Sequence, residues 1–188
     1  MPIAADADID KILANNRSFS FRKRRATALI VLMRDTSARR SEIARLNVAN
    51  VHLDDGYLQI LQTKNRRPRV VPLSPDLRTA LLKYLTARRY HRHAADDALF
   101  IGKKGRLRAD SLGNIVADLA DAAGVKITCH TFRRRMAYQW AAKGGTDDAL
   151  QLVCGWKSPR MPARYRQGLA QKLADDQFRR IVGGSAST

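Results

Sequence analysis

The segment around His130 and Arg133 offers two groups that can bind a phosphate. The two residues are three apart in a stretch with helical spacing, so their side chains share one helix face. The pattern H-x-x-R is common by chance, and its plain alternative is a solvated basic face. Arg39 upstream and Tyr165 downstream add a second guanidinium group and a hydroxyl. We therefore ask whether these groups suit phosphate chemistry.

Cleavage of a phosphodiester needs its charge neutralised, a nucleophile in line with the leaving oxygen, and an acid for that oxygen. A guanidinium group is always charged and can hold two phosphate oxygens in a planar fork. A tyrosine hydroxyl can attack phosphorus and keep the bond energy in a covalent link. The sequence shows no carboxylate cluster suited to two magnesium ions, so it favours a route without metal or other cofactor.

These groups stand in an order that resembles the tyrosine recombinases of the phage integrase family. The family pattern is a TGxRxSE box, a Lys in a hairpin before an R-x-VPL strand, an HxLR box, a G-H/W dipeptide and a Tyr nine residues later. The matching features are the box at 36–42 with Arg39, Lys64 before the segment 69–73, His130 with Arg133, Gly155-Trp156, and Tyr165. The resemblance extends over roughly residues 26–165.

The chain departs from the family pattern at a few positions. Ser37 stands where Gly is usual, which concerns local turn geometry, and Phe132 replaces the usual Leu. Arg134 stands where His is common, and Trp156 occupies a position that is usually His, although Cre-type members also have Trp there. None of these changes removes a catalytic group.

The resemblance implies a role for each residue. Tyr165 is expected as the nucleophile that forms a 3′-phosphotyrosyl link, with Arg39 and Arg133 holding the phosphate. Lys64 is expected to protonate the leaving 5′-oxygen, and His130 to bind the phosphate or assist the tyrosine proton. Trp156 can donate one hydrogen bond but cannot act as an acid or base.

Each assignment has a plainer alternative. Arg39 could be surface charge, Lys64 one basic hairpin residue among several, and Tyr165 a packing aromatic. Trp156 could pack in the core and donate a hydrogen bond at once. Glu42 is interpreted as a partner that supports an arginine rather than a catalytic group.

The charge balance points to a polyanionic partner. The 188 residues carry a formal net charge of +18, and double-stranded DNA is the expected partner. An anionic membrane is the competing interpretation, but we find no amphipathic anchor, lipidation motif or long apolar run. The residues expected to contact the DNA backbone are Arg22, Lys23, Arg24, Arg25, Arg66, Arg67, Lys103, Lys104, Arg106, Arg108, Arg134 and Arg135.

Hydrophobic spacing predicts the elements that must position these residues. Helices are expected over 6–15, 19–34, 41–46, 75–89, 110–123, 130–143, 147–154 and about 169–181. Strands are expected over 57–63 and 69–73, joined by a hairpin turn, with an extended piece over 98–101. Leu77, Leu81, Leu82 and Leu85 are expected to face inward. The fold class is α+β, mainly α, with a small antiparallel sheet, as in the helical catalytic domain of tyrosine recombinases.

The expected domain organisation is an N-terminal arm or short helix over 1–18, a catalytic domain over 19–168, and a C-terminal helix and tail over 169–188, without a core-binding domain. The helix near the C-terminus is expected to dock on a neighbouring protomer or to fold back on its own. Only Cys129 and Cys154 are present and neither is in a CxxC pair, which argues against a zinc site or a disulfide framework.

The predicted function is that of a site-specific DNA recombinase that cleaves and rejoins strands. Two alternatives stay open: a type IB topoisomerase, and a non-catalytic DNA-binding regulator derived from a recombinase. The resemblance further implies a tetrameric synapse on DNA, possible help from DNA-bending proteins, no membrane partner, and a cytoplasmic, nucleoid-associated protein of prokaryotic or phage origin.

Overall fold

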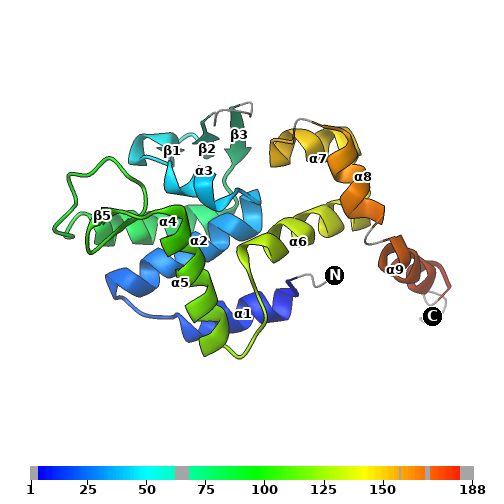
Figure 1. The fold of residues 1–188 in the computed structure, drawn as a ribbon, viewed down its shortest axis with the longest axis horizontal. Coiled ribbons are helices and arrows are strands. Elements are labelled where there is room, and N and C mark those ends of the chain that lie inside the picture. Colours follow the sequence, from blue (N-terminus) through cyan, green and yellow to red (C-terminus); the bar gives the residue numbers. More distant parts are fainter. Residues whose placement is uncertain (1–3, 62–67, 157, 168–169, 183–188) are drawn as a thin grey trace.

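The computed structural model describes residues 4–61, 68–156, 158–167 and 170–182, and of residues 164–166 and 172–173 it describes only the backbone. In these residues helices dominate, accompanied by a three-stranded antiparallel sheet and a separate two-stranded hairpin (Figure 1). This arrangement confirms the predicted fold class. No helix among the described residues is both long and apolar enough to cross a membrane.

Helix α2 (Phe21–Thr36) forms the centre of the main core. Every residue from Ala28 to Met33 is buried, because α1, α4, α5 and α6 all pack around this helix. A helix that is apolar on all sides is stable only when it is covered on all sides. The Ser20 hydroxyl accepts a hydrogen bond from the Lys23 N–H and caps the helix start, two residues later than predicted.

Helix α1 (Asp6–Asn15) has the predicted bounds and belongs to the folded body of the domain. Its Ile9 and Ile12 are buried in the main core, and the Asp6 carboxylate pairs with Arg135 and accepts hydrogen bonds from Gln139, both on α6. The segment expected as an arm or short helix is therefore a helix that packs against the helices that follow it.

The other helices follow the sequence predictions closely, with one addition. Their bounds are α3 (Arg40–Ala44), α4 (Pro75–Arg88), α5 (Ala109–Ala122), α6 (Cys129–Ala142), α7 (Asp147–Cys154), α8 (Arg160–Gln167) and α9 (Ala170–Val182). The sequence reading did not predict α8. It was also wrong about Leu82, which is 55% exposed, because the buried stripe of α4 runs through Leu77, Leu81 and Tyr84.

Three short strands form the sheet on which the predicted hairpin is built. A 3-10 turn over Val48–Asn50 leads into β1 (Val51–His52), followed by β2 (Tyr57–Ile60) and β3 (Arg69–Pro72), in the order β1-β2-β3. Strands β2 and β3 are antiparallel, with Ile60 opposite Arg69. The antiparallel pairing confirms the two predicted hairpin strands, and Lys64, between them in the sequence, lies outside the described residues. Strand β1 was not predicted.

A second hairpin follows α4. Strands β4 (Ile101–Gly102) and β5 (Gly105–Arg106) pair across the two lysines, Lys103 and Lys104, that were expected to contact DNA. Lys103 and Lys104 are exposed there. Arg88 of α4 donates hydrogen bonds to the carbonyls of Ala94, Asp96 and Ala98, and so organises the loop that leads to this hairpin.

A smaller core lies beneath α7. It consists of Ala137, Leu150, Cys154 and Trp156, with Met136, Trp140 and Met161 packed against it. These residues come from α6, α7 and α8, so this cluster places the C-terminal helices relative to α6. Helix α9 lies farthest out, at the right of Figure 1, and its Phe178, Ile181 and Val182 are exposed.

Candidate active site

The corner between α2 and α3 brings the two predicted clamp arginines into one region. Arg39 is the N-cap residue of α3, with an extended backbone, and its N–H donates to the Glu42 carboxylate over 2.8 Å. Arg133 reaches the same corner from α6, where its Nη1 donates to the carbonyl of Ser37, two residues before Arg39. Arg133 is only 4% exposed. Three helices therefore supply one site.

Both arginines have buried N–H groups that are not used within the described residues. Arg39 Nη1 and Arg133 Nη2 are shielded from solvent and have no hydrogen-bond acceptor there. The Glu42 carboxylate lies 3.9 Å from Arg39 Nη1, which is too long for a hydrogen bond. A buried donor without an acceptor is unfavourable in a folded protein. The geometry thus offers two oriented guanidinium groups to an anion.

Glu42 supports the site as predicted. Its side chain is 2% exposed, and its two carboxylate oxygens accept hydrogen bonds from Arg69 Nη1 and Nη2 over 3.3 and 3.0 Å. These two parallel hydrogen bonds join β3 to α3 through Glu42, whose carboxylate also accepts from the N–H of the N-cap residue Arg39. The sequence predicted Arg69 only as the first residue of the strand over 69–73, so its role in holding the site was missed.

His130 and Trp156 flank Arg133. His130 lies in the first turn of α6, one turn before Arg133, and is exposed. Trp156 follows the left-handed Gly155 that ends α7 and is buried in the smaller core. The Arg133 guanidinium carbon lies 5.6 Å from the centre of the Trp156 ring, within cation–π range. Trp156 therefore has the predicted packing role and also contacts a clamp arginine.

Tyr165 is carried by α8, which packs against both α6 and α7. The backbone around the predicted nucleophile is thus placed beside the helix of His130 and Arg133. The Tyr165 side chain lies outside the described atoms, as does the whole of Lys64. The structure therefore brings together Arg39, His130, Arg133, Trp156 and the helix of Tyr165.

The predicted DNA-contacting residues divide into two groups. Several already bind acceptors within the fold: Arg25 the carbonyl of Ile101, Arg106 the Asn47 side chain and the carbonyl of Ala44, Arg135 the Asp6 carboxylate, Lys23 the carbonyl of Asn15, and Arg24 the carbonyl of Lys83. Arg22, Lys103, Lys104 and Arg108 are exposed, Arg134 is half-buried, and Arg66 and Arg67 lie outside the described residues.

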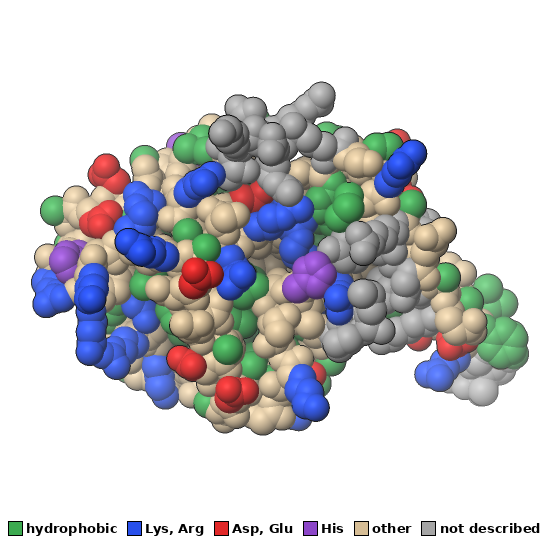
Figure 2. Space-filling view, in the orientation of Figure 1, with side chains coloured by type: hydrophobic (Ala, Val, Ile, Leu, Met, Phe, Trp, Pro, Cys, Tyr) green, Lys and Arg blue, Asp and Glu red, His purple; other side chains and the backbone are tan. Residues whose placement is uncertain are grey.

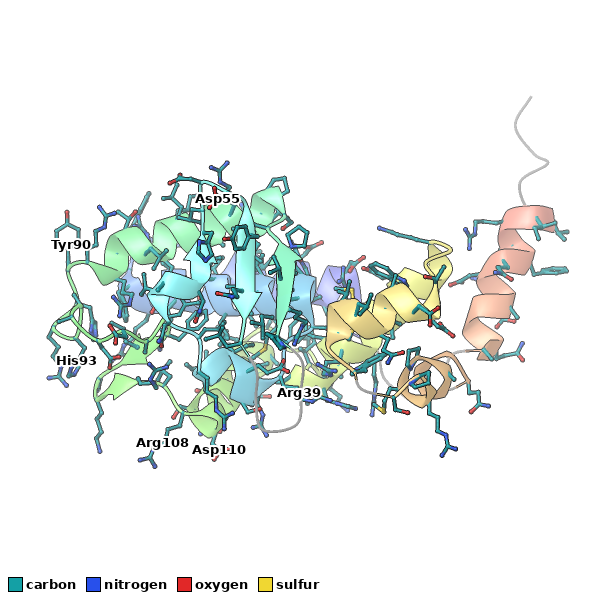
Figure 3. All side chains as sticks on the ribbon, turned by 90° about the horizontal axis from the view of Figure 1, so that it is seen from above. Arg39, Asp55, Tyr90, His93, Arg108 and Asp110 are labelled. Atoms are coloured by element: carbon teal, nitrogen blue, oxygen red, sulfur yellow. The ribbon has the colours of Figure 1, made fainter. Side chains whose placement is uncertain are left out.

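Arg39 and Arg108 point to the same side of the molecule. Figure 3 views the protein from above, and both side chains lie on its lower side, together with Asp110. That side is the face presented in Figure 2, where Lys and Arg side chains are spread widely with a few carboxylates between them. Helix α4 lies on the opposite side in Figure 3. The candidate site thus opens onto a face rich in positive charge.

Comparison with known proteins agrees with this geometry. The chain is similar to tyrosine recombinase XerD of Oceanobacillus iheyensis (30% identical, 81% of this chain, 53% of the relative) and to the type 1 fimbriae regulatory protein FimE of Escherichia coli K12 (30% identical, 78% and 76%). It spans about half the length of XerD and of a further relative, tyrosine recombinase XerS of Lactococcus lactis (28% identical, 85% of this chain, 47% of the relative).

Among solved structures, the XerA recombinase matches with a TM-score of 0.77 at 21% identity, covering 92% of this chain and 64% of that one. The XerH recombinase in a post-cleavage complex with a palindromic difH substrate matches with a TM-score of 0.74 at 20% identity, over 94% and 52%. The model of the phage integrase family matches residues 5–172. The chain therefore belongs to the phage integrase family of tyrosine recombinases.

Proposed function

We propose that this chain is the catalytic part of a site-specific DNA recombinase that cleaves and rejoins strands through a 3′-phosphotyrosine intermediate. The observation that carries the proposal is the pair of guanidinium groups of Arg39 and Arg133, each with a buried N–H that no described acceptor satisfies. The helix of Arg133 packs against the helix that bears Tyr165, and Arg39 lies on the side of the molecule that also bears Arg108.

The chemistry follows from this arrangement. Arg39 and Arg133 would hold the non-bridging oxygens of the scissile phosphate and stabilise the charge that grows there in the transition state. The Tyr165 hydroxyl would attack phosphorus, forming the Tyr–O–P bond while the bond from phosphorus to the 5′-oxygen breaks. Lys64 would give that oxygen its proton, and His130 would bind the phosphate or take the tyrosine proton. The reverse reaction, with a 5′-hydroxyl as nucleophile, rejoins a strand.

The partners proposed are double-stranded DNA and further copies of the protein in a tetrameric synapse. The XerH neighbour was solved bound to a DNA substrate, which supports DNA as the partner. The exposed apolar residues Phe178, Ile181 and Val182 of α9 would contact a neighbouring protomer in that assembly. DNA-bending proteins would assist, and the reaction would take place in the cytoplasm at the nucleoid.

The test is covalent trapping on nicked suicide duplexes. A pool of such duplexes with a randomised core is incubated with the protein, and SDS-resistant protein–DNA adducts are recovered and sequenced. Wild-type protein is expected to form adducts on a defined core sequence. Adduct formation on nearly every sequence, with relaxation of supercoiled plasmid, would indicate a topoisomerase instead, and specific binding without adducts would indicate a regulator.

Substitution of the nucleophile is the first control for that experiment. Tyr165→Phe removes one hydroxyl and leaves the basic face unchanged, so we expect no adduct but nearly unchanged DNA affinity. Binding is measured by gel shift on the duplex selected with wild-type protein. An adduct formed by the Phe variant would mean that another residue is the nucleophile.

A further inference from the structure

Ser37 has a backbone conformation that is unusual for its residue type. It ends α2 with φ 47° and ψ 26°, and it is the one non-glycine residue with a positive φ in the described parts of the chain. A side chain with a Cβ is strained in this left-handed region, whereas glycine adopts it freely. Tyrosine recombinases usually have glycine here, so the serine side chain is present at a conformational cost.

The backbone of Ser37 connects the two clamp arginines. Its N–H donates to the carbonyl of Met33 over 3.1 Å and closes α2, and its carbonyl accepts the hydrogen bond from Arg133 Nη1. The left-handed turn directs the chain into Arg39, two residues further on. Because Ser37 is completely buried, each of these groups depends on protein partners. Glycine would supply all of these backbone contacts.

The Ser37 hydroxyl adds one contact that glycine lacks. Its Oγ lies 3.2 Å from Sγ of Cys154, the last residue of α7, and both residues are completely buried. Burial raises the pKa of the Cys154 thiol, so the sulfur stays protonated and the two groups share a hydrogen bond. Directly after Cys154 come Gly155 and Trp156, and the Trp156 ring faces the Arg133 guanidinium.

We propose that Ser37 is a positioning residue whose hydroxyl, through Cys154, aligns the α7–Trp156 segment with the clamp formed by Arg39 and Arg133. The carbonyl of Ser37 fixes Arg133 from one side, and the Ser37–Cys154 contact fixes the segment that carries Trp156 against the same guanidinium. These two contacts thereby fix the position of α7 and Trp156 relative to the α2–α3 corner. The consequence for catalysis rests on the recombinase function proposed above.

Substitutions at Ser37 separate positioning from simple stabilisation. Ser37→Gly removes the hydroxyl and the strain, whereas Ser37→Ala removes the hydroxyl and keeps the strain. We therefore expect the Gly variant to keep a urea midpoint near that of wild type and the Ala variant to have a lower one. Both should slow single-turnover adduct formation by about tenfold on the selected suicide duplex, with DNA affinity within twofold of wild type.

The partner residue gives the matching half of the experiment. Cys154→Ser keeps a hydrogen bond to Ser37 and should retain the wild-type rate, whereas Cys154→Ala should reproduce the defect. The double variant Ser37→Gly with Cys154→Ala should be no slower than either single variant, because both remove the same contact. Gly124→Ser is the control for strain alone: it places serine in a left-handed turn, φ 64°, where its Cβ meets nothing within 4 Å. It should lower stability and leave the rate unchanged.

Two results would overturn the proposal. One is that Ser37→Gly cleaves at the wild-type rate and only Ser37→Ala is slow. The slower rate would then result from lower stability and not from loss of the hydroxyl. The other is additive slowing in the double variant.

If wild-type protein forms no adduct on any duplex, the proposed function fails. The Ser37–Cys154 contact is then tested separately, by alkylation of Cys154 with iodoacetamide in a Cys129→Ala background. Ser37→Gly should then speed alkylation at least tenfold while Gly124→Ser does not, and equal rates for Ser37→Gly and wild type would reject the contact.

Discussion

Arg133 shows how burial changes what one residue can do. On an exposed helix face its charge would be screened and mobile, but here Nη1 binds the Ser37 carbonyl, the ring of Trp156 covers the guanidinium, and Nη2 has no described acceptor. The plane of the group is therefore fixed before any phosphate arrives. A preorganised donor avoids the cost of reorientation during the reaction, which is the main source of electrostatic catalysis.

Replacing Arg133 by lysine tests this fixed fork. Lysine keeps the charge but cannot bind the Ser37 carbonyl and a phosphate oxygen with one planar group. We expect Arg133→Lys to slow single-turnover cleavage by about a hundredfold or more, a loss of about 3 kcal/mol of transition-state stabilisation. Arg78→Lys, at an exposed position on α4, is the matched control and should cleave at the wild-type rate. A nearly normal rate for the Arg133 variant would remove this residue from the clamp.

Lys64 is tested by changing the leaving group rather than the protein alone. If it protonates the departing 5′-oxygen, Lys64→Ala should cleave an ordinary duplex slowly and a duplex with a 5′-bridging phosphorothiolate almost normally, because sulfur leaves without an acid. Arg39→Ala and Arg133→Ala should stay slow on both substrates, since charge on the non-bridging oxygens is unaffected by the sulfur. Equal defects of Lys64→Ala on the two substrates would assign proton donation to another group.

At the level of elements, the sequence was sufficient to predict a helix and its bounds where the local capping signals agree with the pattern of burial. Helix α7 has the predicted bounds because Thr146 caps its start, with its hydroxyl accepting from the Ala149 N–H, and Gly155 ends it in the left-handed conformation. Helix α8 was missed because it is short and polar on average, RMPARYRQ, and carries a proline at its third position. It is helical through packing of Met161 and its neighbours on α6 and α7, a contact that local sequence does not encode.

The same contrast explains which site residues were found. Arg39, His130 and Arg133 were predicted from motifs whose residues lie within a few positions of one another in the sequence, in one helix or one turn. Arg69 acts across 27 residues of chain, by pairing with Glu42, and only the sheet register that faces it toward α3 reveals this role. Leu82 was misplaced because it is one residue, about 100° around the helix, from the buried Leu81.

The Glu42–Arg69 pair joins α3 to β3, so its loss should be felt by both elements. Glu42→Gln removes the negative charge and leaves a buried guanidinium without a counter-ion. We expect a loss of about 3 kcal/mol in the free energy of unfolding, measured with urea. Cleavage should be slower because the side chain that caps Arg39 is no longer held by the fork of Arg69.

Asp118→Asn, an exposed change of the same charge on α5, should have little effect on either measurement. Adding Arg69→Met to Glu42→Gln should recover part of the stability, since the unpaired charge is then gone. If the double variant is less stable than Glu42→Gln alone, the pair does not act through its buried charge.

For the whole molecule, the decisive property is how a net charge of +18 is distributed. Several arginines that composition alone assigned to DNA instead bind carbonyls or carboxylates of the fold, as Arg25, Arg106 and Arg135 do. The charge that remains available is exposed on the face of Arg39 and Arg108 and also on α4 behind it. Only the part that touches phosphates releases counter-ions on binding.

Salt dependence distinguishes contact from general attraction. Changing Lys103, Lys104 and Arg108 together to Gln should reduce the slope of log Kobs against log salt concentration by about 2.7, at about 0.9 for each lost phosphate contact. Changing the exposed Arg78, Lys83 and Arg89 to Gln removes the same charge from α4 and the residue after it. Helix α4 lies opposite Arg39 and Arg108 in Figure 3, so the slope should stay nearly unchanged. The slopes are measured by fluorescence anisotropy on one labelled duplex between 50 and 300 mM salt. If the two triple variants lower the slope equally, net charge alone drives binding, and DNA does not lie on the face that bears Arg39.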